Sequence, residues 1–329
     1  MSSETKTIEL FEWIDKTTIS LQNSMDETYL DSLNMTLEAL FYGGLNRKVD
    51  ITIQQKVAKQ LQTVDIEQMD VMEIRKAIQF AVLKGMKKST QPQHSMTPEA
   101  ISLFVGYLAE KLMKKHQEVR VFDPASGTGN LLLIVMGHIT QLTKAYASEI
   151  DPTLIKLSAL SANLQKKQVE FFHQDSLRPL LLDPVDLVVS DLPVGYYPDD
   201  VQASNFNLKS EKGHTYAHHL FIEQSLHYTK DGGFLIFIIP DNLFDSEQSN
   251  ILQPFIQKTC HIIGLLQLPE TAFASKENKK SILILQKKGA NTKPVNQPLL
   301  VILPSFSEPD AMENIIVKIN QWFTDVGLP

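Results

Sequence analysis

The feature that most constrains this chain is an alternation of short apolar runs with amphipathic segments over its last two thirds. The apolar runs occupy residues 119–122, 145–150, 169–172, 185–190 and 234–239, and helical patterns occupy 130–141 and 152–166. Strands that are apolar on both faces are typical of parallel sheets that crossover helices cover. Strands and helices in alternation therefore predict an α/β fold with a doubly wound, mostly parallel sheet.

Two later runs, at 262–268 and 282–286, complete a predicted seven-stranded, Rossmann-like sheet. We expect them to form a hairpin-like pair at the edge of the sheet. Residues 299–303 could add one more strand, and residues 311–322 are predicted to form a terminal helix.

Residues 1–88 are predicted to form an N-terminal helical domain, because apolar side chains recur there at three- and four-residue steps. A polar segment from Lys84 to Pro92 marks the expected boundary, so that a sheet domain occupies residues 89–329. No pattern in the helical region indicates chemistry. Its expected role is packing or the binding of a partner.

The acidic balance and the single cysteine limit the class of protein. A net charge of -7 does not suit a protein that coats nucleic acid, so DNA binding would need a local basic face or a partner subunit. Cys260 alone cannot form an internal disulfide and fits a reducing compartment. The chain lacks a signal-peptide pattern, and no apolar run is long enough to cross a membrane. We expect a cytoplasmic protein without a membrane partner.

The strand at 119–122 leads into a turn that is predicted to bind a cofactor. The turn begins at Asp123 and is rich in small residues, namely Pro124, Ala125, Ser126, Gly127, Thr128 and Gly129, before a helix that starts with Asn130 and Leu131. Ligands of doubly wound folds bind at the carboxyl ends of strands, and glycines let the backbone approach a ligand closely. Glu149 and Ile150 end the next strand, where a carboxylate can accept the two hydroxyls of a ribose.

Two cofactor classes share a glycine turn with a downstream acid. A dinucleotide binder needs a third glycine, and Leu132 stands in that position. Asp123 immediately before the turn suits a cationic ligand such as the ammonium group of an amino acid. These residues favour S-adenosyl-L-methionine, with its ammonium, sulfonium and ribose, over a nicotinamide cofactor.

Two further segments are candidates for the same site. Asp175 and Ser176 follow the third strand, where Asp175 could bind the amine of an adenine or could serve only as a turn residue. Thr97 precedes Pro98 and Glu99, a combination that predicts a helix start with Thr97 as its cap.

The fourth strand ends in Asp191-Leu192-Pro193-Val194-Gly195-Tyr196-Tyr197. With the glycine turn, this segment resembles the Asp/Asn/Ser-Pro-Pro-aromatic motif of amino-methylating DNA methyltransferases, and most of all the N6-adenine modification subunits of type I restriction systems. The likeness covers roughly residues 90–289 and is supported by segments at 96–98, 219–226, 231–233, 239–244 and 281–285.

The resemblance implies a catalytic role for Asp191, Leu192, Pro193 and Tyr196. Asp191 and a backbone carbonyl near Leu192 and Pro193 would accept the two N–H groups of an exocyclic amine, and Asp191 would also contact the cofactor. A stacking ring would come from Tyr196 or Tyr197, since Val194 stands where the family has an aromatic residue. Thr97 would contact the cofactor from the segment before the sheet.

The likeness implies an adenine-N6 DNA methyltransferase that binds DNA weakly alone and obtains specificity from a protein partner; a homodimer is possible. Two alternatives stay open: a methyltransferase acting on RNA or a protein glutamine amide, and a catalytically impaired protein of regulatory or assembly function. Leu192 and Val194, which depart from the family motif, motivate the last.

Three surface features remain. Residues 199–218 are predicted to form a polar loop, which is either a lid or substrate contact or a segment that is disordered without cofactor or substrate. His214, His218 and His219, in or next to this loop, are not expected to bind a metal. Lysines cluster at 84–88, 111–115 and 276–280, and the third cluster could meet a phosphate backbone.

Overall fold

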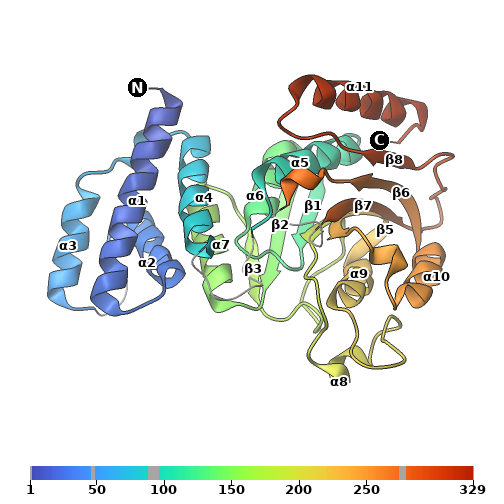
Figure 1. Ribbon diagram of the computed structural model, residues 1–329, viewed down its shortest axis with the longest axis horizontal. Helices are drawn as coiled ribbons and strands as arrows, with labels where there is room; N and C mark the ends of the chain where they lie inside the picture. Colours follow the sequence, from blue (N-terminus) through green and yellow to red (C-terminus); the bar gives the residue numbers. More distant parts are fainter. Residues whose placement is uncertain (1, 46–48, 88–95, 274–278, 329) are drawn as a thin grey trace.

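The computed structural model describes residues 2–45, 49–87, 96–273 and 279–328. The amino-terminal part consists of helices α1 (Ser3–Met25), α2 (Tyr29–Tyr42), α3 (Ile51–Leu61) and α4 (Val71–Lys87) (Figure 1). Hydroxyl side chains begin the first two helices, because Ser2 accepts a hydrogen bond from the Thr5 amide and Thr28 accepts one from the Asp31 amide. Gly43, with φ of 75°, ends α2 in the left-handed conformation. The predicted helical region is confirmed; its predicted end at residue 88 lies outside the described residues.

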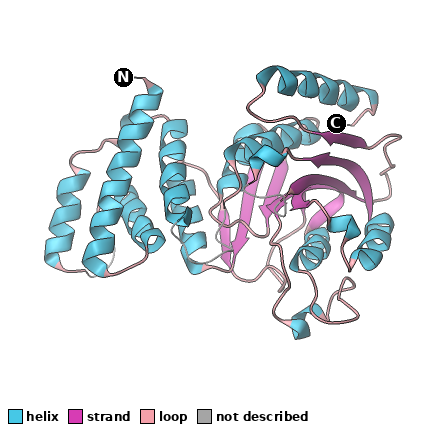
Figure 2. Cartoon of the chain, in the orientation of Figure 1, coloured by secondary structure: helices cyan, strands magenta, loops and turns pink. Residues whose placement is uncertain are grey.

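The helical region shares its core with the sheet domain through helix α7 (Pro152–Leu164). Leu157, Leu160 and Leu164 of α7 are buried in the same cluster as the apolar faces of α1, α2 and α4. The Asn34 amide donates to the Thr153 carbonyl at 2.9 Å across this junction. Helix α7 therefore packs against the sheet and against the helical region at once, as Figure 2 also shows.

Within the described residues, one sheet of eight strands runs in the order β3-β2-β1-β4-β5-β7-β6-β8. The strands are β1 (Val119–Asp123), β2 (Leu142–Glu149), β3 (Glu170–His173), β4 (Val185–Asp191), β5 (Thr229–Pro240), β6 (Cys260–Gln267), β7 (Lys280–Lys287) and β8 (Leu299–Ile302). Only β7 among them runs antiparallel to its neighbours. The predicted doubly wound, mostly parallel architecture is confirmed.

Two details of the predicted sheet differ. The sheet has eight strands instead of seven, because β8 pairs in parallel with β6 and becomes the edge. The β6–β7 pair is antiparallel as expected, but β7 also pairs with β5 and so lies inside the sheet.

Helices cover both faces of the sheet. Helices α5 (Glu99–Met113), α6 (Asn130–His138) and α11 (Pro309–Asp325) share one apolar cluster with alternate residues of the central strands. Helices α9 (Ala217–His227) and α10 (Ser249–Thr259) share a second cluster with the intervening strand residues. Burial on both faces explains why these strands are apolar throughout.

The segment at 199–218 is packed against the protein, in contrast to the disordered segment that was one of the two expectations. It contains the short helix α8 (Asp200–Ala203), and its last two residues begin α9. Phe206 and Leu208 are buried, and the Glu223 carboxylate accepts hydrogen bonds from the amides of Asn207 and Leu208. No described helix is both long and apolar enough to cross a membrane.

Candidate active site

Three carboxylates gather where the neighbouring strands β1, β2 and β4 end. These are Asp123, Glu149 and Asp191, the last described residues of their strands. The pKa of Asp123 is raised to about 7, chiefly by burial and also by the negative charges of Glu149 and Asp191, against the hydrogen bonds that Ala125 and Ser190 donate to it. A site with this much negative charge suits a cationic ligand.

The glycine turn between β1 and α6 needs glycine at two positions. Gly127 and Gly129 have φ of 51° and 79°, where residues with a side chain are strained. A Cβ on Gly129 would also lie 2.2 Å from the Ser158 hydroxyl, whereas a Cβ on Gly127 would meet nothing within 4 Å. The turn is thus tight on its inner side and open beside Gly127. The Ser126 hydroxyl is buried there without a hydrogen-bond partner.

Glu149 holds the turn from the next strand. One of its oxygens accepts the Gly127 amide at 2.8 Å, and the other accepts the amides of Ile150 and Asp151 at 2.9 and 3.0 Å. The side chain of Ile150 is 64% exposed beside it. An anchored carboxylate next to an exposed apolar side chain fits a ribose followed by a planar ring.

Asp175 and Ser176 lie in the loop after β3, and both side chains already have partners. Asp175 accepts the Leu177 amide at 2.9 Å, as a turn residue does, and accepts the Tyr197 hydroxyl at 2.5 Å. The buried Ser176 hydroxyl donates to the Pro124 carbonyl at 2.6 Å. Ser176 therefore joins the glycine turn to the loop after β3, and the predicted contact of Asp175 with adenine stays a prediction.

Thr97 does not cap helix α5 as expected. The N-cap position is Pro98, without a side-chain hydrogen bond, and the Thr97 hydroxyl instead donates to Asp191 Oδ2 at 2.9 Å. The Asn130 amide donates to the Thr97 carbonyl at 2.8 Å. Leu131, another predicted cofactor residue, has its side chain in the core and can present only its backbone to a ligand.

The segment after β4 has Leu192 and Val194 where the family motif has a proline and an aromatic residue, yet it continues the pairing of β4 with β5. Leu192 is 1% exposed, and its amide donates to the Ile238 carbonyl at 3.1 Å, which extends the pairing of β4 with β5. A proline could not make this bond. Gly195, with φ of 123°, turns the chain so that Val194 is 60% exposed.

A column of stacked rings that the sequence did not reveal runs from the surface toward this segment. Tyr196 stacks on Tyr216 with ring centroids 4.9 Å apart, and Tyr216 stacks on His218 at 5.0 Å. His218 is buried, which lowers its pKa to about 4, and it hydrogen-bonds the Pro193 backbone. Neutral His218 thereby positions the carbonyl that the resemblance assigned to the substrate amine. The only hint in the sequence was the pair of histidines after Tyr216.

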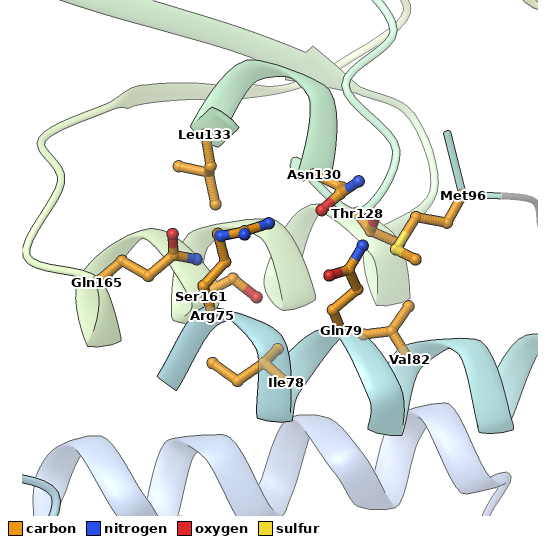
Figure 3. A pocket seen from close by; sticks show the side chains of 10 residues that line it. All are labelled: Arg75, Ile78, Gln79, Val82, Met96, Thr128, Asn130, Leu133, Ser161 and Gln165. Carbon is orange, nitrogen blue, oxygen red and sulfur yellow. The ribbon is translucent and has the colours of Figure 1, made fainter. Parts of the chain in front are cut away.

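A small polar cavity lies between helix α4 and the start of α6, with α7 forming another wall (Figure 3). Its volume is about 20 Å³, which suits one water molecule. Arg75 Nη1, Gln79 Oε1 and Gln165 Oε1 are buried at its lining without a protein partner. Thr128 and Asn130, at the glycine turn, line the other side. The helical region therefore reaches the back of the cofactor turn.

The residues present fit the expected cofactor. The turn is open beside Gly127, the buried Ser126 hydroxyl needs a partner, and the three carboxylates suit the positive charges of S-adenosylmethionine. Among the described residues, no group of three or more His, Cys, Asp or Glu side chains could hold a metal ion.

Comparison with known proteins agrees with this geometry. Residues 86–309 match the N-6 DNA methylase family, and residues 8–86 match the N-terminal helical domain of YtxK-like proteins. The chain belongs to the N-6 DNA methylase family. It is an S-adenosylmethionine-dependent methyltransferase.

Whole-chain relatives support the assignment. The YtxK protein of Bacillus subtilis is 44% identical over 319 residues, which cover 95% of this chain and 96% of YtxK. A proposed class I S-adenosylmethionine-dependent methyltransferase from Listeria monocytogenes is 42% identical, with a TM-score of 0.90 and coverage of 97% and 99% of the two chains.

A more distant structure shares the fold. The methyltransferase subunit of a type I restriction-modification system from Streptococcus thermophilus is 15% identical, with a TM-score of 0.66 over 97% of this chain and 74% of that chain. The predicted likeness to such subunits is confirmed at the level of fold.

Proposed function

We propose that this chain transfers a methyl group to the exocyclic N6 amine of adenine in DNA. The observation that carries the proposal is the position of Asp191, which ends β4 beside the glycine turn, and of Pro193 two residues later, so that a carboxylate and a backbone carbonyl follow each other at the end of one strand. Two acceptors side by side suit an amine with two N–H groups.

When bound, the cofactor would supply a methyl group on a sulfonium; its transfer to the amine nitrogen would leave a neutral thioether, and the proton that the nitrogen loses would pass by way of the Asp191 carboxylate to solvent. Asp191 and the Pro193 carbonyl accept the two amine N–H bonds, which draws the nitrogen lone pair out of conjugation and orients it. Thr97 holds Asp191 Oδ2 at 2.9 Å, and His218 holds the Pro193 backbone. Such alignment of reactants contributes several kcal/mol to a rate enhancement.

Tyr196 supplies a stacking face for the acceptor ring. Its side chain is 55% exposed, and its other face is supported by Tyr216. Because Gly195 separates it from exposed Val194, Tyr196 takes over the role that the family gives to the residue at position 194. Base stacking on an aromatic side chain contributes about 1–3 kcal/mol.

The direct test is methyl transfer from radiolabelled S-adenosylmethionine to three acceptors measured side by side: adenine-containing duplex DNA, RNA of the same sequence and a glutamine-containing peptide. We expect transfer to DNA, with N6-methyladenine as the product in nucleoside mass spectrometry. Asp191→Ala should abolish transfer, whereas cofactor binding should be weakened without being lost, because Asp123 and Glu149 remain. Preferential transfer to RNA or the peptide would contradict the acceptor assignment, and cofactor binding without any transfer would favour a regulatory or assembly role.

We also propose that sequence specificity comes from a protein partner. The net charge of -7 disfavours DNA binding by the chain alone, and the fold relatives include subunits of type I restriction-modification systems. Electrophoretic mobility shifts with the isolated chain should show weak, salt-sensitive and sequence-independent DNA binding. Tight binding to one sequence would contradict this part of the proposal.

A further inference from the structure

The carboxylate assigned to the acceptor amine is already paired with a lysine of the same chain. Lys280 Nζ lies 2.5 Å from Asp191 Oδ1, while the Thr97 hydroxyl occupies Oδ2. The two side chains of the ion pair are 23% and 20% exposed, so the pair is largely removed from water. An acceptor amine must therefore compete with an amine of the protein itself.

The sheet topology brings Lys280 to this place. Strand β5 separates β4 from β7, and the register pairs Asp191 with Ile238 and Lys280 with Pro240. Because β7 is antiparallel, its first residue lies at the edge where β4 and β5 end. Lys280 thus reaches across the end of β5 to Asp191, from within the lysine cluster that the sequence analysis singled out.

The charge of Lys280 determines what displacing it costs. Breaking an ion pair that is largely out of water leaves both charges without a partner, which is strongly unfavourable. A neutral acceptor amine replaces the ammonium as a donor to Asp191 and offers nothing to Lys280. An acceptor with an anionic group beside its amine gives the displaced ammonium a new counter-ion.

We propose that Lys280 is a specificity-determining residue that admits amines carried on a polyanion and excludes uncharged acceptors such as a glutamine amide. The inference rests on the proposed function and narrows its acceptor to a nucleic-acid base flanked by phosphates. Lys280 pairs with the Asp191 carboxylate when no acceptor is bound, and it contacts a phosphate of the acceptor when one is bound.

The first test needs no acceptor. Lys280→Met removes a positive charge beside the cofactor site, so it should favour cationic S-adenosylmethionine over S-adenosylhomocysteine, whose sulfur is neutral. We expect the ratio of the two dissociation constants, measured by calorimetry, to change by about threefold to tenfold. Lys279→Met is the matched control, because Lys279 pairs with Glu270 instead of Asp191. An equal ratio in both variants would overturn the inference.

The second test varies the charge of the acceptor. Methyl transfer is compared between an oligonucleotide with phosphodiesters around the target adenine and one with neutral methylphosphonates there. The wild type, Lys279→Met and Lys280→Arg should prefer the phosphodiester at least tenfold in kcat/KM, and Lys280→Met should lose that preference. A preference for the phosphodiester that survives in Lys280→Met would contradict the inference. Better transfer by the wild type to a glutamine peptide than to the phosphodiester oligonucleotide would contradict it as well. If no acceptor is methylated, the proposed function fails and the inference, which rests on it, fails with it; the cofactor ratio then reports only whether the charge of Lys280 acts on the cofactor site.

Discussion

Single residues at this site have environments that their sequence positions only partly indicate. The strand ends predict Asp123 and Glu149 as site residues, the family resemblance predicts Asp191, and the structure brings all three together. Their degree of burial was not predictable, because it depends on Ser190, Ser176 and the loops that cover them. Asp123 is 1% exposed, whereas Glu149 is only partly buried.

The raised pKa of Asp123 predicts a pH-dependent cofactor affinity. A cationic ligand favours the ionised carboxylate, and the pKa of about 7 leaves that form in the minority at pH 6. Affinity for S-adenosylmethionine should therefore rise about tenfold between pH 6 and 7.5, following the ionised fraction. Calorimetric titration at each pH measures this rise, and Asp123→Asn should show a flat profile if it still folds. A flat wild-type profile would contradict the prediction.

The same shift predicts the effect of pH on the ligand-free protein. The folded-state pKa of Asp123 is raised from 3.8 to about 7, so the folded state holds this proton more tightly than the unfolded state does. The contribution of Asp123 to stability is fully present below pH 4 and is lost as pH rises to 7. The free energy of unfolding in urea should therefore fall for the wild type, relative to Asp123→Asn, as the pH rises from 4 to 7.

Glu149 should contribute strongly to cofactor affinity. Glu149→Ala would remove the predicted charge-assisted hydrogen bonds to the ribose, worth about 1.5–3 kcal/mol, and so weaken binding roughly tenfold to a hundredfold. It also frees the Gly127 amide and so loosens the turn. Glu170→Ala, on the exposed neighbouring strand, is the control and should bind normally. Unchanged affinity in Glu149→Ala would rule out the ribose assignment.

At the scale of elements, the sequence predicted the order of strands and helices but not how the motif after β4 tolerates its substitutions. The apolar periodicity of β1 to β5 is local, so it was visible directly. From the sequence alone, Leu192 in place of the family's proline was a reason to consider a catalytically impaired protein. In the structure, Leu192 instead contributes a buried side chain and one more hydrogen bond between β4 and β5.

Restoring the family proline should accordingly destabilise this protein. Leu192→Pro removes the amide that donates to the Ile238 carbonyl and leaves that carbonyl without its donor, at a cost of about 1–3 kcal/mol. Val194→Phe, at a 60% exposed position, should change stability by less than about 0.5 kcal/mol. Both values come from urea unfolding. Equal stability of Leu192→Pro and the wild type would show that this hydrogen bond is unimportant.

For the molecule as a whole, the helical region packs behind the glycine turn, where α4 lines the same small cavity as Thr128 and Asn130. Arg75 of α4 pairs with Glu99 at the start of α5 at 2.5 Å, and it lines the polar cavity behind the glycine turn. The sequence indicated no chemistry before residue 88, because a buried arginine on an amphipathic helix has no local signature. The role of Arg75 depends on helices that lie far away in the sequence.

Arg75→Met should therefore lower the stability of the whole chain. It leaves Glu99 without its cation, at a cost of about 2–4 kcal/mol given that Glu99 is partly exposed. Lys76→Met removes the same charge from an exposed position on α4 and should be nearly neutral. Thermal unfolding monitored by circular dichroism compares the two variants. Similar melting temperatures would contradict a supporting role for the ion pair.

The sequence by itself determined the fold class, and it predicted the position of the cofactor turn and the segment that would meet the acceptor. Each of these depends on local periodicity, glycine turns or the residue at the end of a strand. Only the tertiary structure decided that Lys280 pairs with Asp191, that His218 hydrogen-bonds the Pro193 backbone, and that Arg75 lines a cavity behind the glycine turn. These contacts join residues distant in the chain or depend on how a loop packs, and one sequence carries no pattern that specifies which distant side chains meet.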